Sequence, residues 1–205
     1  MKPLALHTGR AMSLRRGDVD TDQIIPAEFC KRLTKSGFED ALFATWRADA
    51  GFPLNDPLRQ DATVLVAAHN FGTGSSREHA VWALRDWGFR AVVASSFGDI
   101  FRRNALKNGV LAVELPARSI EGLAARVEAD PAFEITVDLE ACELRADGHS
   151  HPFEVERRAR WLLLNGYDDI AVTLHHHEAI SGYETTRPSW LPRIDAAGTG
   201  LLDRA

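Results

Sequence analysis

The chain has 205 residues, 45% of them hydrophobic and 26% charged, and its 24 basic and 29 acidic side chains give a net charge of −5. This length and composition suit one folded domain with extensions and argue against a disordered or fibrous protein. The acidic balance disfavours nucleic acid as a partner. Because no apolar run is long enough to span a membrane and no apolar segment near Met1 resembles a signal peptide, we expect a cytoplasmic protein without membrane contact.

Residues 1–60 show no clear strand or helix periodicity. An aspartate-rich segment, Asp18-Val19-Asp20-Thr21-Asp22, begins like a calcium-binding loop, but Gln23 and Phe29 stand where such a loop requires glycine and glutamate. Two interpretations remain for this segment. It is either a turn stabilised by side-chain caps or a tight loop that brings a carboxylate, such as that of Asp22, to a site.

Residues 61–116 carry a regular pattern, and we expect the core of the fold there. Short β-branched apolar runs predict buried strands, and apolar residues at helical spacing predict helices between them. The expected elements are a strand at 63–68, a helix capped by Ser75 or Ser76 and ended by Gly88, a strand at 91–94, a helix at 99–107 with Ile100, Leu106 and Phe101 facing inward, and a strand at 110–113. This order is typical of a parallel sheet with right-handed crossovers.

The rest of the chain predicts further helices and a hairpin. The expected elements are a helix at 119–128, a strand at 135–139, a hairpin around Asp147-Gly148 that brings 153–155 alongside, and helices at 157–164 and 168–183. We expect one domain over residues 1–188, with its core at 61–116 and C-terminal helices at about 157–186, and a loose tail over 189–205. The run His175-His176-His177-Glu178 favours a solvated helix over a metal site, because adjacent helical residues point about 100° apart.

The strongest chemical signal is Asn70-Phe71-Gly72-Thr73-Gly74-Ser75-Ser76-Arg77-Glu78-His79, placed where a strand ends and a helix begins. Free backbone N–H groups and the positive end of the helix dipole stabilise an anion at such a junction. The serine hydroxyls can donate to carboxylate oxygens, and Arg77 can bind one through two parallel hydrogen bonds. The segment therefore predicts a carboxylate or phosphate site. The alternative is that a serine only caps the helix and that Arg77 is solvated.

Three familiar motifs do not fit this junction. A dinucleotide fingerprint needs a third glycine where Arg77 stands, and a phosphate-binding P-loop needs a lysine that is not present. A hydrolase nucleophile elbow needs a glycine two residues after the serine. The cysteines are also limiting, since Cys30 and Cys142 are far apart, form no zinc motif and cannot supply the ligands of a four-cysteine iron–sulfur cluster.

Three segments, residues 17–26, 70–80 and 96–104, resemble the aconitase superfamily, and within it the long bacterial form of the 3-isopropylmalate dehydratase small subunits. The resemblance runs nearly the whole chain. It implies an α/β fold, a three-layer β/β/α swivelling domain like the C-terminal domain of aconitase, with a C-terminal helical extension. It also implies a hydro-lyase of leucine biosynthesis that is active only with a large subunit, as a heterodimer or larger assembly. That subunit would hold a [4Fe–4S] cluster, and this chain would bind no metal.

The resemblance also assigns roles to residues. Ser75 matches the serine that, as an alkoxide, removes a proton next to a carboxylate. Ser76 and Arg77 match binders of the substrate carboxylates, and Thr21 and Asp22 match a Thr-Asp pair that borders the site. The expected substrate is therefore a small dicarboxylate.

A loop after Pro26 tunes the side group of the substrate in this family, and here it contains Phe29, Cys30, Lys31 and Arg32. Phe29 can pack against an alkyl group, and Lys31 or Arg32 can supply a further cation. Cys30 stands where we expect a hydrophobic residue. Isopropylmalate is the favoured substrate, with homoaconitate-type or methyl-substituted malates as rivals. A non-catalytic anion-binding module is the alternative from another functional class.

Overall fold

A computed structural model gives the structure of the chain and describes residues 1–192. The chain divides into two compact units at Asp168, and each is described by itself. This division is not the boundary at residue 188 that the sequence led us to expect. The expected tail, residues 189–205, lies mostly outside the described residues.

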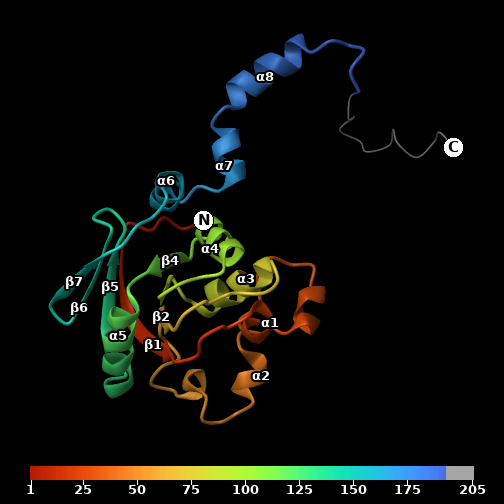
Figure 1. The fold of residues 1–205 in the computed structure, drawn as a ribbon. Coiled ribbons are helices and arrows are strands. Elements are labelled where there is room, and N and C mark those ends of the chain that lie inside the picture. The colour runs from red at the N-terminus through yellow and green to blue at the C-terminus, as the bar shows by residue number, and fades with distance from the viewer. Residues whose placement is uncertain (193–205) are drawn as a thin grey trace. The chain divides into compact units, whose positions relative to one another are not determined.

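One sheet of seven strands organises the first unit, in the spatial order β4-β3-β2-β1-β5-β6-β7 (Figure 1). Four strands run parallel, namely β1 (Leu6–Leu14), β2 (Val64–Ala67), β3 (Ala91–Ala94) and β4 (Leu111–Glu114). Three more continue the sheet in antiparallel pairs, namely β5 (Glu134–Asp138), β6 (Glu143–Ala146) and β7 (His149–Pro152). The parallel core expected at residues 61–116 is confirmed, but it includes one strand more than the sequence predicted.

That additional strand, β1, joins the two halves of the sheet. Its first residues pair with β5, with Leu6 opposite Asp138, and its last residues pair with β2, with Ala11 opposite Val64. Only the second part of β1 is fully buried, whereas its first part alternates between exposed and half-buried residues. The sequence missed β1 because His7, Thr8, Gly9 and Arg10 interrupt the apolar pattern that predicts a buried strand.

Four longer helices accompany the strands of this unit: α3 (Glu78–Trp87), α4 (Asp99–Lys107), α5 (Ala117–Ala129) and α6 (Arg157–Asn165). All four were expected, and Gly88 ends α3 with a positive φ of 123°. Two details were wrong. The N-cap residue of α3 is Arg77, and neither Ser75 nor Ser76 caps the helix with a side-chain hydrogen bond. In α4 the buried residues are Phe101 and Ala105, whereas Ile100 is 44% exposed.

Shorter helices lie in the first sixty residues: α1 (Thr21–Ile24), η1 (Ala27–Lys31), α2 (Ala44–Arg47) and η2 (Pro53–Asn55). Asp20 caps α1 in a reciprocal capping box with Gln23. The Asp-rich segment is thus a capped turn, and the same turn also points Asp22 toward Arg77, as described below. The hairpin at Asp147-Gly148 is confirmed, with both residues at positive φ, but its second strand is β7 rather than residues 153–155.

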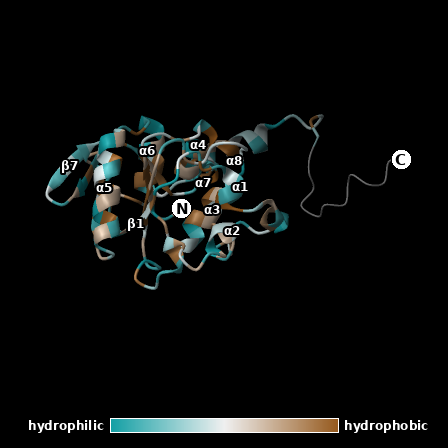
Figure 2. Cartoon of the chain, turned by 60° about the horizontal axis from the view of Figure 1, so that its bottom comes forward, coloured by the Kyte–Doolittle hydropathy of each residue, from teal (hydrophilic) through white to brown (hydrophobic). Residues whose placement is uncertain are grey.

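Two hydrophobic cores cover the two faces of the parallel strands. On one face, Leu65, Val92 and Ala112 pack with residues of α1, α3 and α4. On the other face, Val64 and Val93 pack with α5 and with residues of β5 and β6, so the sheet curls back over itself (Figure 1). This curl gives the three layers of the expected β/β/α swivelling fold. Figure 2 shows the hydrophobic residues gathered between these layers, with β7 hydrophilic at the outer edge.

The second unit contributes α7 (Asp169–Leu174) and α8 (His177–Thr186) to the described structure. The sequence predicted one helix over residues 168–183, and the chain forms two. Neither has a buried residue, and large apolar side chains such as Ile170, Leu174 and Tyr183 are more than half exposed. None of the described helices combines the length and the apolar character that crossing a membrane requires.

Candidate active site

The predicted site segments meet where β1, β2 and β3 end. Backbone hydrogen bonds tie the segment after β2 to the segment after β1, because the N–H groups of Gly72 and Thr73 both donate to the carbonyl of Val19, at 2.7 and 3.1 Å. The N–H of Thr21 donates in return to the carbonyl of Thr73, at 3.1 Å. Carboxyl ends of parallel strands share one edge of a sheet, so residues about fifty positions apart become neighbours here.

Two glycines allow the loops after β2 and β3 to approach each other closely. Gly72 has a φ of +74°, and a Cβ at this position would overlap the ring of Phe101. A Cβ at Gly98 would lie 2.6 Å from the carbonyl oxygen of Gly72. The two loops therefore pack backbone against backbone, which only glycine permits at these positions.

A polar clamp that the sequence did not predict joins the three strand ends. The side-chain amide of Asn70 donates to Asp18 at 2.7 Å, and the backbone N–H of Asn70 donates to the hydroxyl of Ser96 at 2.8 Å. Hydrogen bonds from Asn70 and His69 lower the pKa of Asp18. Asp18 and Asn70 both have positive φ, which these residue types tolerate better than most. That tolerance was the only signal in the sequence that pointed to this clamp.

Thr21 and Ser75 form the centre of the site. The hydroxyl of Thr21 lies 2.7 Å from Oγ of Ser75 and 3.1 Å from its carbonyl oxygen. Thr21 is almost completely buried, while Ser75 is exposed. The hydroxyl of Ser75 therefore makes its hydrogen bond with Thr21 rather than capping α3.

Arg77 and Asp22 form an ion pair beside these hydroxyls. Nη1 of Arg77 donates to Oδ1 of Asp22, and this bond raises the pKa of Arg77. The Nε and Nη2 groups of Arg77 have no acceptor within residues 1–192, so they can bind a further carboxylate. Ser76 lies between Ser75 and Arg77 in the chain and is exposed. The structure therefore brings Thr21, Asp22, Ser75 and Arg77 together, with Ser76 next to them.

The start of α3 adds donors to this group. Across the described part of the chain, the backbone N–H groups from Ser75 to His79 have no protein acceptor. Together with the dipole of a ten-residue helix, they make this end of α3 favourable for an anion.

The four residues predicted to tune specificity differ in their environments. Phe29 is half-buried against the core, and Lys31 is exposed. Cys30 lies close enough to Arg77 and Asp22 to interact electrostatically with both. Burial is nevertheless the main cause of the raised pKa of its thiol. Either Lys31 or Arg32 was expected to supply a further cation, and the structure shows Arg32 already paired. Its guanidinium forms two hydrogen bonds with the carboxylate of Asp40, at 2.7 and 2.6 Å.

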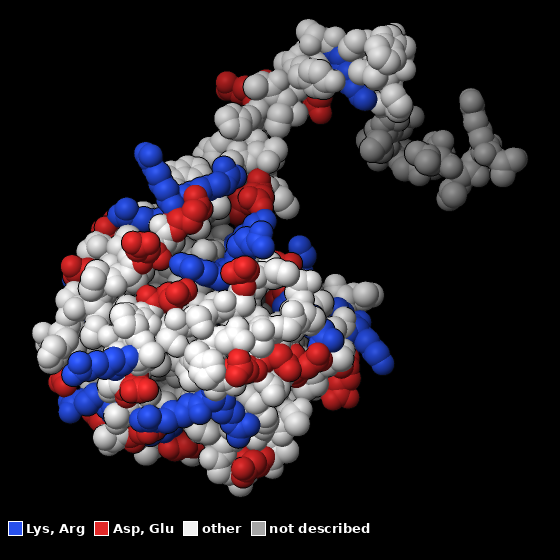
Figure 3. Space-filling view, viewed as in Figure 1, with Lys and Arg blue, Asp and Glu red and all other residues white. Residues whose placement is uncertain are grey.

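No three His, Cys, Asp or Glu side chains gather into a metal-binding group among residues 1–192. Cys30 and Cys142 are both free thiols and are half-buried in different parts of the fold. Lys and Arg side chains are interspersed with Asp and Glu over the face in Figure 3, so charge of one sign does not dominate that face.

Comparison with known families supports the resemblance seen in the sequence. A family model described as the aconitase C-terminal domain matches residues 1–118, and one described as LeuD_N matches residues 121–156. The chain is 57% identical to the 3-isopropylmalate dehydratase small subunit of Frankia alni, over 94% of this chain and 98% of that one. The corresponding protein of Streptomyces griseus is 56% identical over 96% of this chain and 100% of its own.

A solved structure shares the fold. The crystal structure of a 3-isopropylmalate dehydratase (LeuD) from Methanocaldococcus jannaschii matches with a TM-score of 0.65 and 27% identity. The match covers 87% of this chain and 99% of the archaeal one.

Proposed function

Because this chain belongs to the 3-isopropylmalate dehydratase small subunits, a family of hydro-lyase subunits in the aconitase superfamily, we propose that it supplies the base and carboxylate-binding residues of a two-subunit enzyme. The reaction removes water from 2-isopropylmalate to give 2-isopropylmaleate and adds it back as 3-isopropylmalate, in leucine biosynthesis. The observation that carries the proposal is the contact of Thr21 with Ser75 beside the ion pair of Asp22 with Arg77.

Ser75 is proposed to remove the proton. As an alkoxide, its Oγ takes the proton from the carbon next to a substrate carboxylate and becomes a neutral hydroxyl. The electron pair of the C–H bond forms the alkene while the C–O bond on the neighbouring carbon breaks, and the hydroxyl leaves with the electron pair of that bond. A serine hydroxyl has a pKa far above neutral pH in water, so its anion needs strong stabilisation. The Thr21 hydroxyl at 2.7 Å, the nearby Arg77 and the free N–H groups at the start of α3 supply donors and positive charge for that purpose.

Arg77 is proposed to bind one substrate carboxylate, with Ser76 as a neighbouring donor. Asp22 holds the guanidinium through Nη1, which leaves Nε and Nη2 for a two-point contact with the substrate. Such a contact prevents the substrate from rotating and keeps its acidic carbon in front of Ser75.

The η1 segment is proposed to select the side group of the substrate. Phe29 offers an apolar ring, and Cys30 offers a small thiol whose pKa is raised by burial. This pair suits an alkyl group such as isopropyl. Lys31 is exposed, makes no ion pair within residues 1–192, and remains as the cation that the sequence predicted in this loop.

The cluster and the partner complete the proposal. This chain has no ligand group for iron among its described residues, so we assign the [4Fe–4S] cluster to the large subunit of a cytoplasmic complex. The cluster would act as a Lewis acid toward the leaving hydroxyl. Trp161 and Trp190 are 46% and 79% exposed, and we expect them at the contact with that subunit.

The test is a substrate panel with the reconstituted two-subunit enzyme. Dehydration and hydration are followed by the absorbance of the alkene for 3-isopropylmalate, citrate, homocitrate and citramalate. We expect the highest kcat/KM with 3-isopropylmalate. A higher value with homocitrate or citramalate would transfer the proposal to a related hydro-lyase, and activity with none of the four would favour an anion-binding module.

A further inference from the structure

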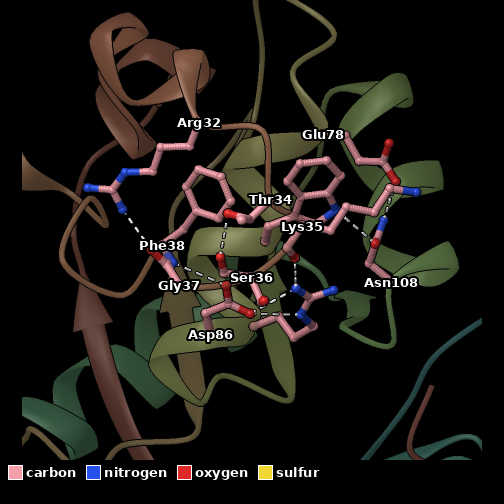
Figure 4. A network of polar contacts seen from close by, with 11 residues as sticks. Arg32, Thr34, Lys35, Ser36, Gly37, Phe38, Glu78, Asp86 and Asn108 are labelled. Atoms are coloured by element: carbon pink, nitrogen blue, oxygen red, sulfur yellow. Dashed lines mark hydrogen bonds and ion pairs between the residues drawn. The ribbon is translucent and has the colours of Figure 1, made fainter.

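The segment that follows η1, residues 32–38, is exposed along most of its length yet has a fixed path. Leu33 in this loop is fully exposed, and Gly37 has open space around it. A loop with so little burial owes its position to a few hydrogen bonds. Figure 4 shows those bonds.

The last turn of α3 holds the middle and the far end of the loop. Oδ2 of Asp86 accepts the backbone N–H of Phe38 at 3.2 Å, and Arg85 donates to the carbonyl of Lys35. Arg85 also donates to Oδ1 of Asp86, from Nε at 3.0 Å and from Nη2 at 2.8 Å. The side chain of Asp86 is only 10% exposed, so its carboxylate is fixed between Arg85 and the loop (Figure 4).

Phe38 packs on the same side of α3. Its ring is fully buried and lies 5.5 Å from the ring of His79 and 5.8 Å from that of Trp82, measured between ring centroids. His79, Trp82 and Asp86 are spaced by three and four residues, so they form one face of the helix. One face of α3 therefore supports the end of the loop over two turns.

The near end of the loop leads directly into the site. Arg32 follows η1 in the chain, and its guanidinium, paired with Asp40, also donates to the carbonyl of Gly37 at 2.6 Å. Cys30 of η1 lies within the electrostatic reach of Arg77, the residue that precedes α3. The helix whose beginning carries the site thus also holds, at its other end, the loop that positions η1.

We propose that Asp86, held by Arg85, is a positioning residue for substrate selection: it fixes residues 32–38 and thereby places η1 against the side group of the substrate. This inference rests on the proposed function of the site. Asp86 lies at the opposite end of α3 from Arg77 and would not touch the substrate. Its loss would loosen the loop but leave the buried Phe38 ring in place, so we expect altered selectivity in a folded protein.

Kinetics of the reconstituted enzyme test the role of Asp86 in substrate selection. The matched control is Asp138→Ala, because Asp138 also accepts a backbone N–H, from Ala141 at 2.8 Å, and pairs with an arginine, Arg145 at 2.8 Å, but lies on β5. Asp86→Ala should reduce the kcat/KM preference for 3-isopropylmalate over citramalate about tenfold, mainly through KM. Asp86→Asn keeps an acceptor for the Phe38 N–H and should restore most of the preference. An unchanged preference in Asp86→Ala, or an equal loss in Asp138→Ala, would overturn the inference.

Trypsin cleavage of the chain tests the loop without any assay of activity. Lys31, Arg32 and Lys35 provide cleavage sites, and intact mass identifies the cut. We expect the loop of Asp86→Ala to be cut about tenfold faster than the loop of the parent, because cleavage follows local opening. The loop of Asp138→Ala should be cut at the parent rate. An unchanged cleavage rate would refute the role of Asp86 in holding the loop, even if the enzyme is active. If the parent does not act on 3-isopropylmalate but Asp86→Ala is still cut faster, the proposed function fails while the holding role stands.

Discussion

The hydroxyl of Thr21 has one hydrogen and two acceptors on Ser75. While that hydrogen goes to the carbonyl of Ser75, the Ser75 hydroxyl must itself donate to Thr21. Once Ser75 has lost its proton, rotation of the Thr21 hydroxyl directs its hydrogen to the alkoxide. A hydrogen bond to a charged acceptor is about twice as strong as a neutral one, so this change favours the deprotonated serine.

Removing this hydroxyl should therefore slow the reaction. Thr21→Val keeps the shape of the buried side chain, and in the reconstituted enzyme we expect kcat to fall about a hundredfold, with KM within about twofold of the parent. Thr21→Ser restores the hydroxyl and should recover most of the rate. Steady-state kinetics of the parent, Thr21→Val and Thr21→Ser measure kcat and KM for this comparison. A parent-like kcat in Thr21→Val would show that Thr21 does not assist Ser75.

Arg77 should matter through its shape as well as its charge. In Arg77→Lys the ammonium keeps the charge but cannot make a planar two-point contact, so KM for 3-isopropylmalate should rise about tenfold or more. Arg145→Lys changes another arginine that pairs with an aspartate, far along the sheet on β6, and should leave KM unchanged. Equal KM values for parent and Arg77→Lys would remove Arg77 from substrate binding.

At the scale of elements, the sequence predicted those parts of the fold whose pattern is uniform. The strands at Val64–Ala67 and Ala91–Ala94 are apolar throughout, and their bounds were close to correct. The strand at Leu6–Leu14 was missed because it changes along its length from half-exposed to buried. Its position in the sheet, fixed by pairing on both sides, depends on the tertiary fold rather than on local pattern.

The same limit applies to the site. Ser75 and Arg77 were predicted from a motif at a strand end, Asp22 was suggested by the aspartate-rich segment, and the role of Thr21 came from the family resemblance. Their mutual contacts depend on β1 lying next to β2, which local periodicity did not indicate. The sequence left Lys31 and Arg32 as alternatives for a similar reason, because the partner of Arg32, Asp40, comes from a loop whose path no pattern predicts.

The close packing of the site loops gives a test of stability. Gly148→Ala, in the open β6–β7 turn, meets only the conformational cost of a positive φ, about 1 kcal/mol. Gly72→Ala meets the same cost and also overlaps the ring of Phe101, so its free energy of unfolding should fall by about 1–3 kcal/mol more. Urea unfolding of both variants measures this difference. Equal losses would mean that the loops do not pack as described.

The cap of α6 gives a test of pH dependence. The carboxylate of Glu156 accepts the backbone N–H groups of Arg158 and Ala159, each at 2.9 Å, and these bonds lower its pKa from the ordinary 4.5. A lowered folded pKa means that the stabilisation is complete above the unfolded pKa and is lost as pH falls through the folded value.

Glu156→Gln removes the charge that this cap contributes. The parent should be more stable than the variant at pH 7, and the difference in the free energy of unfolding should shrink as pH falls from about 5 to 3. Urea unfolding of both proteins at each pH measures this difference in free energy. A difference that stays constant over this range would show that the Glu156 carboxylate is not the cap of α6.

On the scale of the whole molecule, we propose that a second subunit completes the site. Ser75, Ser76 and Asp22 are all exposed, and water in contact with a serine alkoxide would protonate it before it could take a proton from carbon. A partner that covers the carboxyl edge of β1–β3 would exclude this water. We propose that the large subunit is this partner and that it also carries the cluster of the proposed reaction.

The most direct test of this account is the turnover of 3-isopropylmalate by the reconstituted two-subunit enzyme with Ser75→Ala. We expect kcat to fall at least about a thousandfold while the variant still co-purifies with the large subunit, and neither subunit should be active alone. Ser150→Ala, an exposed serine on β7, serves as the control and should keep the parent kcat. A kcat for Ser75→Ala within a few fold of the parent would contradict the account.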